Sequence, residues 1–138
     1  MKKKFGYGPG GQLVRDRTME YSLQGDSSCR FSYKYLSEQE LQPHLFNQLQ
    51  EEVAEVLAAN NKEEICAELA DVLDIIELLK KHNNISEQEL AAARQHKYKL
   101  RGGFDTKLFV EWIEFGNPSG PHEFYEYCLS NPEKYPKL

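Results

Sequence analysis

Four acidic residues form two pairs with the same internal spacing. Glu52 and Glu55 are three residues apart, and so are Glu68 and Asp71. Residues three apart share one face of a helix, so each pair can present both carboxylates to one ligand. Oxygen ligands without a neighbouring imidazole or thiolate favour hard divalent cations. The sequence therefore predicts a site for Mg²⁺, or for Mn²⁺, formed by these four carboxylates.

Two predicted helices carry the acidic pairs. Apolar residues recur at helical spacing from about residue 43 to 59, where Pro43 suits a first helical position, and again from about 62 to 82. Asn60-Asn61 interrupts the pattern. Because this connection is so short, the two helices are expected to pack antiparallel, as a helical hairpin.

In such a hairpin the acidic pairs are expected to meet. Facing residues are equidistant from the turn, and Glu55 mirrors Glu68 about the same point at which Glu52 mirrors Asp71. Carboxylates this close repel one another, which raised pKa values or bound cations relieve. The alternative interpretation is that all four belong to solvated faces of amphipathic helices, because Glu is a common helix former.

The remaining sequence predicts a mainly helical protein. Capping boxes, in which Ser precedes Glu by three residues, begin at Ser37 and Ser86, and the second opens a helix that should end near Arg101. The flanking segments predict a helical turn within 13–24, strands or extended backbone at 31–36 and 108–115, a turn at 117–121 and a short helix at 122–129. The fold class is therefore all-α, an antiparallel helical bundle with short strands allowed in the flanks.

Composition narrows the function classes. The 138 residues suggest one domain, and the net charge of −5 disfavours a nucleic-acid polymer as partner. No apolar run approaches the roughly 20 residues that span a membrane, so no membrane association is expected. The basic Lys2-Lys3-Lys4 start is not followed by an apolar stretch, and three scattered cysteines form no framework. A cytoplasmic location is therefore expected.

Three sequence blocks together resemble one protein family. They are Leu13-Val14-Arg15-Asp16-Arg17; Glu51-Glu52-x-x-Glu55 followed after twelve residues by Glu68-x-x-Asp71; and the segment from Lys97 to Phe104 with its Arg-Gly-Gly-Phe. Their order and spacing are similar to those of the MazG-like all-α nucleoside triphosphate pyrophosphohydrolases, in particular the phosphoribosyl-ATP pyrophosphohydrolase-like branch. The sequence departs from the family pattern in three places: the twelve-residue gap is at the short end of the family's range, Arg17 replaces a usual Lys, and Thr18-Met19 replaces a frequent Ile-Pro.

The resemblance covers residues 13–104 and implies a domain organisation. Residues 1–12 would form a flexible N-terminal arm, residues 13–104 the MazG-like domain, and residues 105–138 a C-terminal extension packed on that domain. Proteins of this family are commonly dimers or tetramers, so the resemblance also implies a homo-oligomer.

The resemblance further implies an activity. A nucleoside triphosphate, or a nucleotide like phosphoribosyl-ATP, would be cleaved to its monophosphate and pyrophosphate with Mg²⁺ as cofactor. Its site residues would be Glu51 and Glu52 for catalysis, Glu52, Glu55, Glu68 and Asp71 for the metal, and Arg15, Lys97 and Arg101 for substrate phosphates. Glu51 can equally face solvent, and the three cations can equally serve as surface ion pairs or helix C-terminal contacts. The alternative function is a non-catalytic helical module that binds a nucleotide or a protein.

Overall fold

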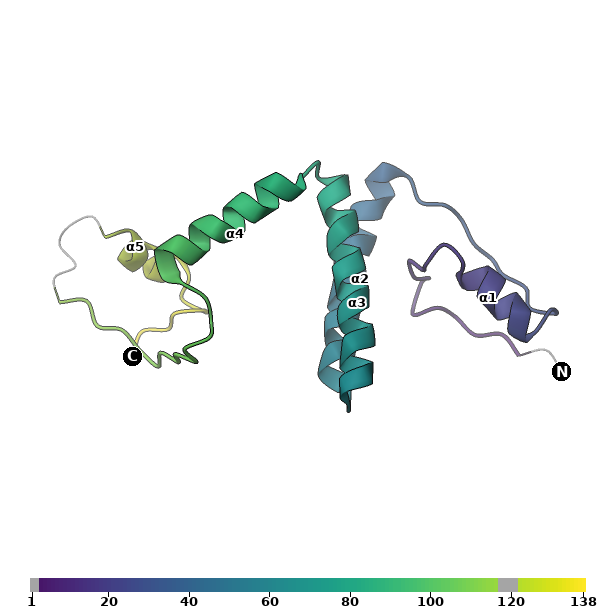
Figure 1. Cartoon of the computed structure of the whole chain (residues 1–138), viewed down its shortest axis with the longest axis horizontal. Coiled ribbons are helices and arrows are strands. Elements are labelled where there is room, and N and C mark those ends of the chain that lie inside the picture. Colours follow the sequence, from purple (N-terminus) through teal and green to yellow (C-terminus); the bar gives the residue numbers. More distant parts are fainter. Residues whose placement is uncertain (1–2, 117–121) are drawn as a thin grey trace. The chain divides into compact units, whose positions relative to one another are not determined.

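A computed structural model describes residues 3–116 and 122–138 of the chain, and its regular structure is helical. The helices are α1 (Thr18–Gly25), α2 (Glu38–Ala58), α3 (Lys62–His82), α4 (Glu87–Arg101) and α5 (Glu123–Ser130) (Figure 1). The all-α prediction is confirmed. The chain divides into two compact units, Met1–His96 and Lys97–Leu138.

The helical hairpin formed by α2 and α3 is the centre of the first unit. The two helices pack against each other as an antiparallel pair (Figure 1). Leu45 of α2 and Ile75 of α3 are its buried apolar residues. Three polar residues, Gln48, Glu52 and Lys80, are buried in the same hairpin. Polar and charged groups therefore take up much of a small interior.

The start of α2 differs from the prediction, because the helix begins at Glu38 and not near Pro43. The Ser37 hydroxyl accepts a hydrogen bond from the Glu40 backbone N–H, and the Glu40 carboxylate accepts one from the Ser37 N–H. This capping box satisfies two backbone donors and nucleates the helix. Pro43 therefore lies inside α2 and has no N–H to donate to the Gln39 carbonyl one turn earlier. Because Gln39 is exposed, water can donate to that carbonyl instead.

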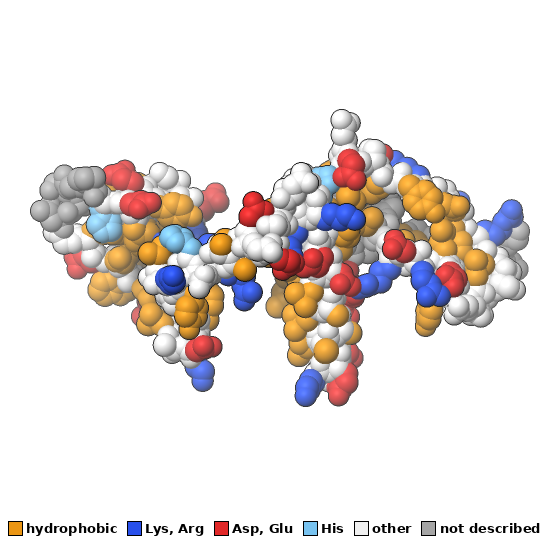
Figure 2. Space-filling model, turned by 45° about the horizontal axis from the view of Figure 1, so that its top comes forward, with side chains coloured by type: hydrophobic (Ala, Val, Ile, Leu, Met, Phe, Trp, Pro, Cys, Tyr) orange, Lys and Arg blue, Asp and Glu red, His pale blue; other side chains and the backbone are white. Residues whose placement is uncertain are grey.

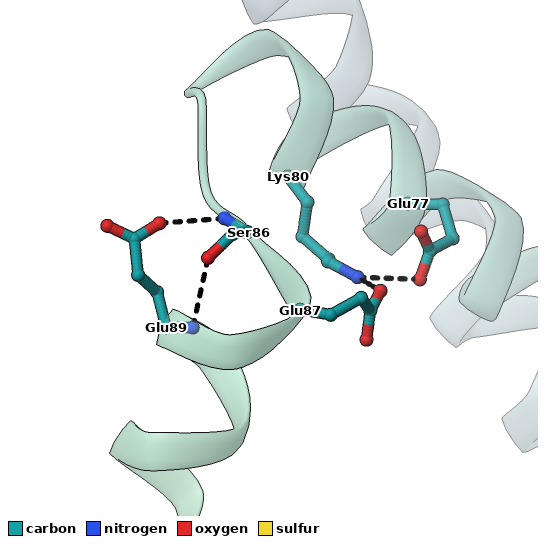
Figure 3. Close-up of polar contacts among 5 residues, drawn as sticks. All are labelled: Glu77, Lys80, Ser86, Glu87 and Glu89. Atoms are coloured by element: carbon teal, nitrogen blue, oxygen red, sulfur yellow. Dashed lines mark hydrogen bonds and ion pairs between the residues drawn. The ribbon is translucent and has the colours of Figure 1, made fainter.

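The predicted bounds of α3 and α4 are confirmed. The Asn61 side chain accepts a hydrogen bond from the Glu64 N–H at the start of α3, as an N-cap. At the start of α4, Ser86 and Glu89 exchange the two hydrogen bonds of the second capping box (Figure 3). Gly102 follows α4 at φ +76°, a left-handed conformation that favours glycine and ends the helix.

Lys80 ties the end of α3 to the start of α4. Its side chain is 8% exposed, and its ammonium group pairs with Glu77 at 3.0 Å and with Glu87 (Figure 3). Two carboxylates thus compensate the desolvation of a buried cation. The corner between the two helices is fixed by this ion pair and by the adjoining capping box.

The strands allowed at 31–36 and 108–115 do not form in the described residues. Both segments lack helix and strand structure, because the backbone hydrogen bonds outside the helices join near neighbours in turns and caps. A strand requires a partner to complete its ladder, and local aromatic content does not supply one. The short helix expected at 122–129 is confirmed as α5, whereas the turn predicted at 117–121 lies outside the described residues.

Aromatic rings hold part of the second unit together. Phe115 lies 5.1 Å, between ring centroids, from both His122 and Tyr125, in edge-on geometry. Tyr135 packs on Phe124 at 5.5 Å in the same way. Such ring pairs contribute stability beyond that of the apolar area they bury. They therefore anchor α5 to the segments on either side of it. Throughout the described residues, no helix combines the length and apolar character needed to cross a bilayer.

We expect Ser86→Ala to destabilise the protein, because it removes the hydroxyl that caps α4. The loss should be about 1 kcal/mol in the free energy of unfolding, the usual contribution of an N-cap serine. Chemical denaturation followed by circular dichroism measures it. Gln88→Ala, an exposed change in the same helical turn, is the control and should leave the unfolding free energy within about 0.5 kcal/mol. Equal stability of the two variants would contradict a role for the cap.

Candidate metal centre

Three of the four predicted metal ligands converge in the hairpin. Glu52 and Glu55 lie on α2, Glu68 lies on α3, and one carboxylate oxygen of each lies within 4.8 Å of the other two. Two oxygens that ligate one cation are at most about 5 Å apart around Ca²⁺ and about 4 Å apart around Mg²⁺. The three oxygens are therefore close enough to share a divalent cation, with a small inward movement for Mg²⁺.

Glu52 is the most constrained member of the cluster. It is 8% exposed, and its Oε1 accepts a hydrogen bond of 2.6 Å from the Nε2 of Gln48, one helical turn earlier. Its Oε2 is buried and accepts no hydrogen bond from the described residues, and the contact of the Glu52 carboxyl with that of Glu55 is a hydrogen bond only when Glu52 is protonated. A buried oxygen without a partner costs about 1–3 kcal/mol. This atom therefore marks a position that a cation would occupy favourably.

The carboxylates alter one another's acidity. Burial raises the pKa of Glu52, and the nearby charges of Asp71 and Glu55 raise it further. Contact with the Glu68 side chain raises the pKa of Glu55, and burial and the Glu68 charge act in the same direction. Both shifts express the same fact, that three carboxylates held this close cannot all be ionised without cost.

The donor set fits Mg²⁺ or Mn²⁺. Each of the three clustered ligands offers carboxylate oxygen, and the cluster contains no imidazole or thiolate. Hard cations such as Mg²⁺ and Mn²⁺ prefer this chemistry, whereas zinc and copper favour nitrogen or sulfur. The unpartnered Oε2 of Glu52 is the independent sign that the set suits a cation.

Asp71, the fourth predicted ligand, adjoins the cluster but is engaged elsewhere. Its carboxylate pairs with the guanidinium of Arg15, which also lies 2.8 Å from Asp74. Asp71 is still near enough for its charge to raise the pKa values of Glu52 and Glu55. The structure therefore places Arg15, predicted to bind phosphate, directly beside the acidic site.

The other predicted residues lie outside the cluster. Glu51 is exposed, and its Oε2 accepts a hydrogen bond of 2.8 Å from Gln12. Consecutive helical residues point about 100° apart, which is why Glu51 does not join Glu52. Lys97 and Arg101 are exposed residues of the second unit, one turn apart in the last part of α4.

Two residues of the site were missed in the sequence. Gln48 orients Glu52, and Asp74 shares Arg15 with Asp71. Asp74 follows Asp71 by three residues, so it continues the spacing that singled out the acidic pairs. Gln48 precedes Glu52 by four, a helical spacing too common to be informative without the burial of both side chains.

Comparisons with protein-family models, with curated proteins and with solved structures find no match for this chain. The class that the fold and the site define is thus an all-α protein with a carboxylate cluster in a helical hairpin.

We expect Glu55→Gln to stabilise the metal-free protein, because it removes one of three repelling carboxylates. A raised carboxyl pKa contributes stability that is present below the unfolded value of 4.5 and is lost as pH rises through the folded pKa. The gain should therefore appear near pH 7 and vanish near pH 4. At neutral pH we expect a rise in melting temperature of about 2–4 °C, measured with a chelator present.

Adding Mn²⁺ should reverse this order, because the wild-type protein gains stability from the ion and Glu55→Gln gains little. Glu63→Gln, which alters an exposed carboxylate of the first turn of α3, is the control. Equal stabilisation of wild type and Glu55→Gln by Mn²⁺ would count against the site.

Proposed function

We propose that this protein is a magnesium-dependent nucleotide pyrophosphohydrolase, which cleaves a nucleoside triphosphate or a phosphoribosyl-ATP-like nucleotide to monophosphate and pyrophosphate. The observation that carries the proposal is the buried, unpartnered Oε2 of Glu52 in a cluster of three carboxylates. The three sequence blocks that resemble MazG-like enzymes support it, because the cluster comes from the central block.

In this proposal Glu52, Glu55 and Glu68 hold the cation, and Asp71 joins them from the adjoining turn. When bound, Mg²⁺ supplies neutralisation of phosphate charge and lowers the pKa of water. Gln48 keeps one oxygen of Glu52 fixed, so that the other faces the cation. The chain therefore supplies an oriented set of oxygens before substrate arrives, which reduces the reorganisation needed during reaction.

The remaining roles fall to groups other than the three clustered glutamates. Glu51 orients or deprotonates water once its hydrogen bond to Gln12 is released, and Glu52 is the alternative for that role. Arg15 binds phosphate from beside Asp71, and Lys97 with Arg101 offers two further cations one helical turn apart. Arginine suits this task because its planar fork matches phosphate oxygens.

The alternative function is a helical module that binds a nucleotide or protein without catalysis. The cost of keeping Glu52 buried without a partner favours the enzyme, because a docking module has no need of a desolvated carboxylate. Metal binding separates the two, since a module that binds neither Mg²⁺ nor Mn²⁺ cannot use the cluster for hydrolysis.

We expect release of pyrophosphate from at least one member of a panel of nucleoside triphosphates and phosphoribosyl-ATP in the presence of Mg²⁺. Glu55→Gln should lower the rate by at least about a hundredfold, because a ligand of the proposed cation is lost. Glu63→Gln should keep wild-type activity. Ion chromatography of the products distinguishes pyrophosphate from phosphate. A folded, Mg²⁺-binding protein that turns over no member of the panel would eliminate the enzymatic proposal.

The apolar face of the hairpin supports the proposal that the protein is a homo-oligomer. Large apolar residues of the hairpin remain between 39% and 83% exposed: Phe46, Val53, Leu57, Ile65, Leu69, Leu73 and Leu78. Figure 2 shows hydrophobic side chains gathered on the surface of the molecule. Val53 follows the buried Glu52 on α2, and Leu69 follows the half-buried Glu68 on α3. Because the same offset on two antiparallel helices points to the same side, these apolar side chains share one face of the pair. An apolar face of this kind can pack on the same face of another subunit. We propose that a second copy of the chain covers it.

We expect the wild-type protein to sediment as a dimer or tetramer and Leu57→Glu to shift it toward the monomer. Leu57 is 83% exposed, so the glutamate costs little in the monomer but would be desolvated in the interface. Leu100→Glu, at a 68% exposed position outside the hairpin, is the matched control. A monomeric wild-type protein at tens of micromolar would rule out this assembly.

A further inference from the structure

Arg15 occupies a position where a cation of the chain itself meets the acidic site. It belongs to the segment that precedes α1, and its guanidinium spans Asp71 and Asp74, which are one turn apart on α3. Gln12, three residues earlier, reaches Glu51 on α2. The segment is thus held to both helices of the hairpin by side chains that end at carboxylates.

This contact accounts for the incomplete ligand set. Glu52, Glu55 and Glu68 share a common centre, whereas the carboxylate of Asp71 is turned to Arg15. A guanidinium remains protonated at any physiological pH, so Arg15 offsets the negative charge of Asp71 for as long as the two are in contact. A metal ion that takes Asp71 as a fourth ligand therefore competes with Arg15 for the negative charge of this carboxylate, whose Oδ1 is the atom paired with Arg15.

We propose that Arg15 is a resident counter-ion that competes with the metal for Asp71 and, once displaced, binds the phosphates of the substrate. Its side chain is 62% exposed, so it is free to turn away from α3. The phosphates that approach a metal at this cluster come within reach of the released guanidinium, which pairs with them in bidentate geometry. Arg15 thus couples metal binding to substrate binding. This inference rests on the proposed function, since both need the cluster to hold metal.

The first experiment uses Mn²⁺ alone, titrated calorimetrically into the full-length protein. Arg15→Gln should bind Mn²⁺ roughly two- to fivefold more tightly than wild type, the amount that losing one exposed competing ion pair permits. Arg17→Gln is the matched control: it removes the same charge from the same segment, but Arg17 pairs with Glu20 of α1. Its Mn²⁺ affinity should equal that of wild type.

A double-mutant cycle separates the effect of the Arg15–Asp71 contact from the effect of the positive charge of Arg15 alone. In the Asp71→Asn background, Arg15→Gln should leave the Mn²⁺ affinity unchanged, because the contested carboxylate is gone. An increase of the same size in both backgrounds would show that Arg15 acts only through its charge, and would overturn the proposal. Circular dichroism of each variant verifies that the helices remain folded.

The second experiment uses inorganic pyrophosphate with saturating Mg²⁺. Here Arg15→Gln should bind about tenfold more weakly than wild type, since a charge-assisted hydrogen bond to phosphate is lost, and Arg17→Gln should not. Opposite effects of one substitution on metal and on pyrophosphate are the result expected. Mn²⁺ binding with equal affinity in wild type and Arg15→Gln overturns this inference alone. A wild-type protein that binds no Mn²⁺ overturns the proposed metal site and this inference with it.

Discussion

The close approach of carboxylates across the α2–α3 hairpin is the constraint on which the rest of this structure depends. Antiparallel packing brings Glu52 and Glu55 of α2 to Glu68 of α3, at a place where a helical pair would ordinarily bury apolar side chains. Glu52 is buried, whereas Glu68 is half-buried and Glu55 is exposed, so the cost of lost hydration falls mainly on Glu52. Compensation of the repulsion among the three carboxylates stabilises the hairpin.

The chain offers several partial compensations, and each is incomplete. Gln48 donates to one oxygen of Glu52 and leaves the other without a partner among the described residues. Raised pKa values let Glu52 and Glu55 take up a proton more readily, which reduces charge but also removes a metal ligand. Arg15 neutralises Asp71 at the edge of the cluster and reaches none of the three clustered glutamates in the contacts described. A divalent cation would compensate the three clustered glutamates at once, because it ligates several oxygens simultaneously.

What could be predicted from the sequence was local. The bounds of α3 and α4 follow from Asn61, Ser86, Glu89 and Gly102, which act within one helical turn. The approach of Glu55 to Glu68 also follows, because a short turn fixes which residues face each other, whereas Asp71 lies outside the cluster. The predicted start of α2 was wrong, because the capping box at Ser37 stabilises the helix by more than Pro43 destabilises it. Strands and the pairing of Arg15 with Asp71 depend on residues distant in sequence, which no local pattern specifies.

The small interior of the hairpin links its stability to its function. With Leu45 and Ile75 as its buried apolar residues, the hairpin has little hydrophobic free energy to offset three repelling carboxylates. A ligand that binds only the folded state adds about 2.7 kcal/mol at a hundred times its dissociation constant. A cation in the cluster and a second copy on the apolar face of the hairpin would therefore both shift the equilibrium between the unfolded and the folded hairpin. Metal affinity and subunit affinity should then rise together, because each favours the one hairpin geometry in which Glu52, Glu55 and Glu68 converge.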